Sequence, residues 1–438
     1  MKFTIKVLFL LVSIESILAA AQISNFEHVV IIVQENRTPD NLFQGLCGPN
    51  RGRCPNPYNL QNFGINSKGQ KLTLTPVSLG TNYDLGHAHS SFVGMCDLDT
   101  ATHQCKMDGA DKTGCTPITT CPAHPQFQFV QSSDVMPYLT MAQRYGWANF
   151  MFQTNQGPSA PAHQFIFAGT SAPTETDDIN ATFVAENPSG LGCLAPLNAV
   201  YKLISPQTAP KEFNLINNPL GTTCFSHPTM GSLLDSHGGT WKYYTPGVGS
   251  IWTAPNWIRE ICVPNSAYTL CTGTEWKRSV DLNPADVLTD ISHCKLANVS
   301  WVIPTGQNSD HPNSNNTGGP SWVASIVNAI GTSTACDNGG GYWKDTVIFL
   351  TWDDGEAGLT TFRPRSCRCR IKDKATTSTG FVSLWLSSPR THQPDTSTTI
   401  GTTSAAFCDL WGTISSSPKV RSTLRTSAPP TISPCSST

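Results

Sequence analysis

Two apolar runs, far apart in the sequence, most constrain what this chain can fold into. The first covers residues 29–33 and the second covers residues 345–350. Continuous runs rich in Val, Ile and Leu are typical of strands buried on both faces, as in a parallel sheet covered by helices. Polar side chains follow the runs closely: Glu35 and Asn36 after the first, and Asp353 and Asp354 after the second. The sequence therefore predicts two core strands that both lead into candidate functional groups.

The other regular segments alternate between strands and helices. We predict strands at residues 147–154 and 299–303, and helices at residues 134–145, from Ser159 onward, and at residues 321–331, where Gly331 would end the helix. The order strand, loop, helix, strand is typical of βαβ units, which predicts an α/β fold.

The polar groups that follow the strands are candidates for one shared site. In doubly wound sheets, ligands bind beyond the carboxyl ends of parallel strands. Four sets of residues occupy such positions: Glu35 with Asn36, the loop of Ser159, Asp310 with His311, and Asp353 with Asp354. If the strands are parallel neighbours, these sets converge at one edge of the sheet.

Glu35, Asn36, Asp353 and Asp354 offer hard oxygen ligands that suit a divalent cation. Without a cation, the gathered carboxylates would repel one another. The alternative is that each acidic residue, taken alone, caps a loop or pairs with Arg37.

Ser159 follows Gly157 and Pro158 and opens a predicted helix. Free backbone N–H groups and the positive end of the helix dipole at such a position favour an anion and would stabilise a developing alkoxide. Ser159 is therefore a candidate nucleophile for attack on phosphorus. The alternative is an ordinary N-cap serine.

Several histidines and aromatic residues are weaker candidates. His87 in "YDLGHAH" and His311 in "SDHP" could donate to phosphate oxygens or protonate a leaving group, or could be structural. We expect His163 to pack near the helix start, and His237 is a still weaker candidate. Trp241–Tyr244 could line a pocket, although aromatic residues at this spacing are more often part of the core.

The first residues have the layout of an export signal. Residues 1–21 contain two lysines, an apolar stretch at residues 7–14 and alanines at residues 19–21. The apolar stretch is shorter than the roughly 20 residues that a membrane span needs. We therefore expect a soluble protein that is secreted or periplasmic, with an uncleaved membrane-anchored signal as the alternative.

Composition narrows the class of protein further. Of sixteen cysteines, twelve lie between Cys47 and Cys336, which predicts disulfides whose pairing the sequence leaves open. A net charge of -2 with only 13% charged residues argues against a nucleic-acid or anionic-membrane binder. One large domain at residues 22–354, with insertions at about 45–125 and 173–280, is the simplest organisation, and the oligomeric state stays open.

Five motifs, in this order, carry a family resemblance: "HVVIIVQENRTPDNLF", "NQGPSAPAHQF", "WKYY", "VSWVIP" with "SDHP", and "DTVIFLTWDD". From about Phe26 to Asp354, the chain resembles the bacterial phosphoesterase family of secreted acid phosphatases and phospholipases C. The resemblance implies the α/β/α sandwich of alkaline-phosphatase-like proteins, with a mostly parallel central sheet.

The resemblance also implies roles for individual residues. It places metal ligands at Glu35, Asn36, Asp353 and Asp354, the hydroxyl nucleophile at Ser159, and phosphate-contacting histidines at His311 and His87. The implied mechanism is in-line attack by the serine, stabilised by a divalent metal ion, followed by hydrolysis of a phosphoseryl intermediate.

The sequence departs from the family at Gly355, where the family continues with a Gly-Gly turn and an Asp-His pair. One reverse translation of "GEAGLTTF" with one leading base, read in the shifted frame, gives Trp-Gly-Gly-Trp-Phe-Asp-His-Val. We therefore hypothesise a single-base deletion, or a sequencing or gene-model error, directly after Asp354. Cys367, Cys369, Cys408 and Cys435 would then be accidental thiols. The alternative is a genuine Ser/Thr-rich tail at residues 355–438.

These patterns favour an exported metal-dependent phosphoesterase acting on phosphomonoesters or on phospholipids, inactive if the tail is a frameshift. The alternative is an exported protein that binds phosphate without turnover. A disulfide-rich structural protein gives no reason for polar groups beyond four strands.

Overall fold

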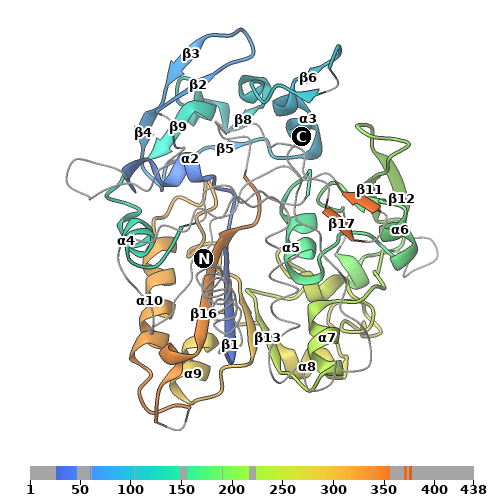
Figure 1. Cartoon of the computed structure of the whole chain (residues 1–438). Helices are drawn as coiled ribbons and strands as arrows, with labels where there is room; N and C mark the ends of the chain where they lie inside the picture. The colour runs from blue at the N-terminus through green and yellow to red at the C-terminus, as the bar shows by residue number, and fades with distance from the viewer. Residues whose placement is uncertain are drawn as a thin grey trace, which may run out of the picture.

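In the computed structural model, the two apolar runs form neighbouring strands of the main sheet (Figure 1). Among the described residues, the main sheet has five strands in the order β14-β13-β15-β1-β16. Their bounds are β14 Val280–Asp281, β13 Trp241–Tyr244, β15 Val299–Val302, β1 His28–Gln34 and β16 Thr346–Trp352. All neighbouring pairs are parallel. The strands therefore point their carboxyl ends to the same edge, as the sequence predicts.

The structure describes residues 26–46, 60, 62–102, 104–147, 155–189, 191–216, 223–337, 339–355, 369–371 and 374–376. The predicted signal peptide, the predicted strand from residue 148 onward and almost all of the predicted tail lie outside these ranges. No described helix is long and apolar enough to cross a membrane.

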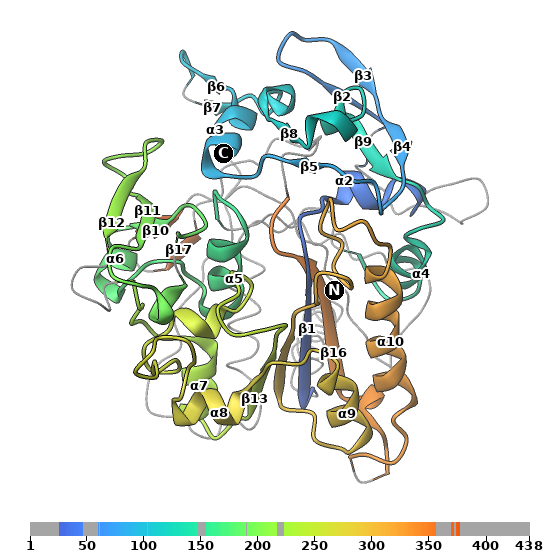
Figure 2. The same cartoon turned by 180° about the vertical axis from the view of Figure 1, so that it is seen from behind.

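Helices cover both faces of the sheet (Figures 1 and 2). The helices on one face are α5 Ser159–Ala168, α7 Met230–Ser236 and α8 Thr274–Ser279; those on the other are α4 Met136–Arg144, α9 Asp286–Ser292 and α10 Gly319–Thr332. Side chains of β1 alternate between the two layers: Ile31 and Val33 pack with the first set, and Val30 and Ile32 with the second. The predicted α/β fold with a mostly parallel sheet between helical layers is confirmed.

The predicted helices differ from the observed ones mainly at their ends. The helix expected at residues 134–145 is α4, which is shorter at both ends. The helix expected to stop at Gly331 is α10, which begins at Gly319 and continues to Thr332. A single glycine weakens a helix by only about 1 kcal/mol, so Gly331 does not end it.

The segment before α4 lies beyond the carboxyl ends of the central strands, in the upper part of Figure 1. It consists of short elements: α2 Pro39–Leu42, β2 Phe63–Ile65, β3 Lys71–Thr73, β4 Thr75–Val77, β5 Asp84–Leu85, α3 His89–Cys96, β6 Leu98–Asp99, β7 Gln104–Cys105, β8 Cys115–Thr116 and β9 Gln128–Val130. This placement brings its loops over the strand ends where the candidate residues lie.

A second, three-stranded sheet lies within the other predicted insertion. Its strands are β10 Phe183–Val184, β11 Val200–Ile204 and β12 Phe213–Ile216, and α6 Glu175–Ile179 precedes them. The same region also supplies central elements, because β13 and α7 fall inside residues 173–280. Two further short strands, β17 Cys369–Ile371 and β18 Lys374–Thr376, pair with each other.

Disulfides fasten the outer segments, as the cysteine count predicts. Five join described cysteines: Cys96–Cys105, Cys115–Cys121, Cys193–Cys224, Cys262–Cys271 and Cys294–Cys336. Cys47 and Cys54 lie outside the described residues.

Candidate functional site

The ends of β1 and β16 place four polar residues side by side. The two strands are in register with Gln34 opposite Trp352, so the residues that follow them meet beyond the sheet. The Asn36 N–H donates to Asp353 Oδ1 at 2.9 Å. Asn36 makes this turn with φ at 55°, a left-handed conformation that asparagine tolerates better than most side chains do.

Ser159, the first residue of α5, lies close to these four residues. Its Oγ lies 3.4 Å from Asn36 Oδ1 and 3.4 Å from Asp354 Oδ2, at the long limit of hydrogen bonding. Pro158 is the N-cap of α5, so Ser159 is the first helical residue and not the N-cap serine of the alternative interpretation. Position 157, two residues before Ser159, requires glycine, because a Cβ there would overlap the Ala185 carbonyl oxygen.

The start of α5 offers fewer donors to an anion than the sequence suggests. The Ala160 N–H donates to Asn187 Oδ1 at 2.9 Å, and the Ala162 N–H donates to the Pro158 carbonyl at 3.3 Å. Pro161 has no N–H to donate. The expectation of several free N–H groups at this helix start is therefore wrong, and the Ser159 N–H and the helix dipole remain.

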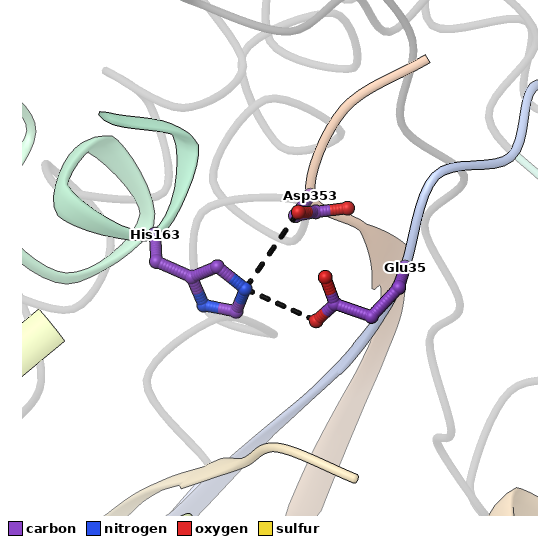
Figure 3. Close-up of side chains that lie close together, drawn as sticks. All are labelled: Glu35, His163 and Asp353. Carbon is purple, nitrogen blue, oxygen red and sulfur yellow. Dashed lines mark hydrogen bonds and ion pairs between the residues drawn. The ribbon is translucent and has the colours of Figure 1, made fainter. Parts of the chain in front are cut away.

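The His163 ring faces the carboxylates of Glu35 and Asp353 (Figure 3). Its Nε2 is 3.1 Å from Glu35 Oε1 and 3.7 Å from Asp353 Oδ2, and all three side chains are fully buried. These three residues offer ligand atoms that lie within 4.8 Å of one another. His163 is thus the site residue that the sequence interpretation assigned only to packing.

Burial dominates the electrostatics of this cluster. Burial raises the pKa of Glu35 well above its usual range, and the nearby carboxylates of Asp353, Asp354 and Asp310 raise it further. Burial also lowers the pKa of His163 to about 4, although the charge of Asp353 opposes this shift. The imidazole is therefore neutral near pH 7, so His163 does not balance the carboxylates of Glu35 and Asp353.

Two histidines lie close to Asn36 and to each other. The Asn36 side-chain amide is 3.2 Å from His87 Nε2, and the ring centroids of His87 and His311 are 6.2 Å apart. Burial lowers the pKa of His87, but the charges of Asp354 and Asp84 outweigh this effect, so the net shift is upward. The Trp252 ring packs beside His311 at 6.1 Å between centroids.

A buried hydrogen-bond network around Asp310 holds the loop that carries His311. Asp310 Oδ2 accepts from the Tyr138 hydroxyl at 2.8 Å and from Trp352 Nε1 at 2.9 Å. Burial raises the pKa of Asp310 to about 6, against the effect of these donors and of the Arg37 charge. Arg37 Nε donates to the Asp310 carbonyl at 2.8 Å, so the guanidinium holds the loop of His311 and does not pair with Glu35.

The structure brings together all seven residues named as catalytic or metal-binding candidates: Glu35, Asn36, His87, Ser159, His311, Asp353 and Asp354. His237 hydrogen-bonds to the Leu233 carbonyl, near the opposite ends of the strands. The Trp241–Tyr244 aromatics are largely core, apart from the Tyr243 hydroxyl, 3.4 Å from His163 Nδ1. His163 follows Ser159 by four residues, so helical spacing alone places both on one face, a signal that the sequence contained.

Comparison with known proteins agrees with this geometry. The model of the phosphoesterase family matches residues 26–359, which is most of the chain. No curated protein matches significantly. The match includes every candidate residue named above and ends a few residues after Asp354.

Proposed function

Because the chain belongs to the phosphoesterase family, we propose that it hydrolyses phosphate esters with Ser159 as the nucleophile. The contact of Ser159 Oγ with both Asn36 and Asp354, in a buried pocket of oxygen ligands, carries this proposal. An ordinary helix-start serine has no reason to point its hydroxyl into a carboxylate cluster.

In the proposed reaction, Ser159 Oγ attacks phosphorus while the bond from phosphorus to the leaving oxygen breaks. The serine proton moves to Asp354 Oδ2, 3.4 Å away. Water then hydrolyses the phosphoseryl intermediate, releasing phosphate and regenerating the hydroxyl. Asn36 orients the nucleophile, because its side-chain oxygen lies 3.4 Å from Ser159 Oγ.

We propose that His87 and His311 contact the substrate. Their rings lie 6.2 Å apart, and His87 Nε2 lies 3.2 Å from the Asn36 side-chain amide. We assign His87 to contacting phosphoryl oxygens, and the net upward shift of its pKa supports this role. We assign His311 to protonating the leaving oxygen.

The residues present fit a divalent cation. Glu35 Oε2 and Asp353 Oδ2 are buried and have no hydrogen-bond partner among the described residues. A buried carboxylate oxygen without a partner costs free energy unless a cation satisfies it. Glu35, Asn36, Asp353 and Asp354 would hold the ion, whose chemistry is to stabilise the charge that develops on the serine and phosphoryl oxygens.

We further propose that the protein acts outside the cytoplasm, as a secreted or periplasmic enzyme. The five disulfides support this, because disulfides persist in oxidising compartments. Phosphomonoesters and phospholipids are the two substrate classes to compare.

The test is hydrolysis of a chromogenic phosphomonoester and of phosphatidylcholine by the purified chain with the family frame restored after Asp354, with and without a chelator. We expect turnover that the chelator abolishes and that Ser159→Ala lowers roughly 10³-fold or more. Ser325→Ala, an exposed change on α10, is the matched control and should leave turnover unchanged. Acid quenching should trap phosphoserine at residue 159.

Turnover by Ser159→Ala equal to that of the starting chain would refute the nucleophile. Tight binding of vanadate without any turnover would instead favour the alternative, an exported protein that binds phosphate.

A further inference from the structure

The Tyr243 hydroxyl determines which hydrogen-bonding role His163 Nδ1 has. Its Nδ1 lies 3.4 Å from the Tyr243 hydroxyl, and that hydroxyl donates to the Trp252 carbonyl at 2.8 Å. A hydroxyl has one proton, so the Tyr243 oxygen can only accept from His163. Nδ1 therefore carries a hydrogen, and Nε2 is the ring nitrogen that remains available to a ligand.

Nε2 faces two carboxylate oxygens, and all three atoms are potential metal ligands. Glu35 Oε1 is 3.1 Å away and Asp353 Oδ2 is 3.7 Å away, and none of the three side chains is exposed (Figure 3). Converging lone pairs in a buried site repel one another unless a positive charge lies between them.

A single proton would satisfy this cluster only in part. A proton on Glu35 could be donated to Nε2, but Asp353 Oδ2 has no hydrogen-bond partner among the described residues, and neither has Glu35 Oε2. A cation shared by all three groups satisfies every one of these atoms. Ligand atoms bound to one first-row metal ion at about 2.1 Å lie about 3.0–3.6 Å apart, close to the distances of 3.1 and 3.7 Å from Nε2 to the Glu35 and Asp353 oxygens.

We propose that His163 Nε2 binds the divalent cation directly, together with Glu35 and Asp353. The inference rests on the proposed metal-dependent function and deepens it. A site with nitrogen and oxygen ligands selects a different class of ion from a site with oxygen ligands alone. Imidazole suits zinc and iron, whereas magnesium and calcium prefer oxygen ligands alone. The site is therefore expected to prefer Zn²⁺ or Fe²⁺ over Mg²⁺ and Ca²⁺.

Tyr243 is a positioning residue in this arrangement. Its hydroxyl fixes the ring orientation and the Nδ1–H tautomer, as the outer partners of metal-bound histidines commonly do. It lies on β13, so the central sheet itself holds the ligand in place.

The test uses the full chain, stripped of metal and loaded with Mn²⁺ as a paramagnetic probe. Pulsed electron paramagnetic resonance should detect the ¹⁴N coupling of a directly bound imidazole. We expect His163→Gln to lose this coupling and to bind Zn²⁺ at least 10-fold more weakly. Tyr243→Phe should keep the coupling but weaken Zn²⁺ binding by about 10- to 100-fold. His237→Gln, remote from the site, is the matched control and should change neither.

Absence of ¹⁴N coupling in the unmodified chain would overturn the inference, as would coupling that persists in His163→Gln. If His163→Gln fails to fold, the spectrum of the unmodified chain and the Zn²⁺ affinity of Tyr243→Phe decide the matter. Chelator-sensitive hydrolysis without ¹⁴N coupling would reject the nitrogen ligand and leave the proposed function intact. Coupling without hydrolysis would support the ligand and reject that function.

Discussion

At the scale of single residues, Asn36 combines a strained backbone with three contacts in the site. Its φ is 55°, its N–H donates to Asp353, and its side chain lies beside Ser159 and His87. We predict that Asn36→Ala and Asn36→Gly both lower kcat/KM for a phosphomonoester by roughly 10²-fold. The alanine variant should be less stable than the glycine variant by about 1 kcal/mol, because a Cβ opposes the left-handed conformation and glycine has none. Enzyme assays and urea unfolding measure the two effects separately.

Asn198 supplies the control, since it is exposed and has φ at 68°. Asn198→Ala should be less stable than Asn198→Gly by a similar amount, with activity unchanged in both. Equal stability of the alanine and glycine variants at position 36 would contradict the strain argument.

The sequence predicts this site unevenly, residue by residue. Glu35 and Asp353 could be expected to meet because each directly follows a buried strand, and parallel strands end at one edge of the sheet. His163 could not be assigned with the same reasoning, since four-residue spacing from Ser159 fixes a helix face but not what that face touches. Its role depends on Tyr243, which comes from a strand 80 residues away in sequence.

At the scale of elements, a pair of carboxylates couples α3 to the three-stranded sheet. Glu186, just after β10, accepts from the His89 N–H at 2.7 Å, where α3 begins. Partial burial and the neighbouring Glu212 raise the pKa of Glu186 to about 7. A raised carboxyl pKa means that the folded state binds the proton more tightly than the unfolded state. The associated stability is therefore present below about pH 4.5 and is lost as the pH rises through about 7.

We predict that Glu186→Gln raises the Tm by about 2 °C at pH 8 and changes the Tm little at pH 4. Glutamine keeps an acceptor for the His89 N–H and removes the like charge beside Glu212. Thermal unfolding at both pH values measures the effect. Glu175→Gln, an exposed change at the start of α6, should give no gain at pH 8. A gain for Glu186→Gln at pH 4 that exceeds the gain at pH 8 would contradict the assignment.

Elements with strong local signals could be predicted, and those built by distant pairing could not. β1 and β16 are long apolar runs with β-branched residues, and α10 has regular helical spacing. In contrast, β14 has only two residues and gains its place by pairing with β13. The parallel pair of β4 and β9 joins residues 53 positions apart, for example Thr75 with Gln128. Short strands of this kind follow from tertiary contacts and disulfides, which leave no periodic pattern.

At the scale of the whole molecule, β16 stands at one end of the described central sheet, paired with β1. All seven of its residues are nevertheless buried. An apolar strand at an edge invites pairing with a further strand, and the family match stops soon after this strand, at residue 359. These two observations support the hypothesis that the sequence after Asp354 is read in the wrong frame and that the segment following β16 belongs to the same domain.

We therefore predict that restoring the family frame after Asp354 increases phosphomonoester turnover at least 10²-fold over the present chain and raises its Tm. The physical reason is twofold: a restored segment would supply a further strand to pair with the backbone of β16, and it would return the Asp-His pair that the family resemblance implies. Steady-state assays and thermal unfolding of both chains measure these effects, and Ser159→Ala in the restored chain controls for contaminating phosphatase. Sequencing of the transcript around codon 354 tests the cause directly. Equal turnover and equal Tm for both chains, or a transcript that encodes the Ser/Thr-rich tail without a missing base, would show that the tail is genuine and that the residues up to Asp354 suffice.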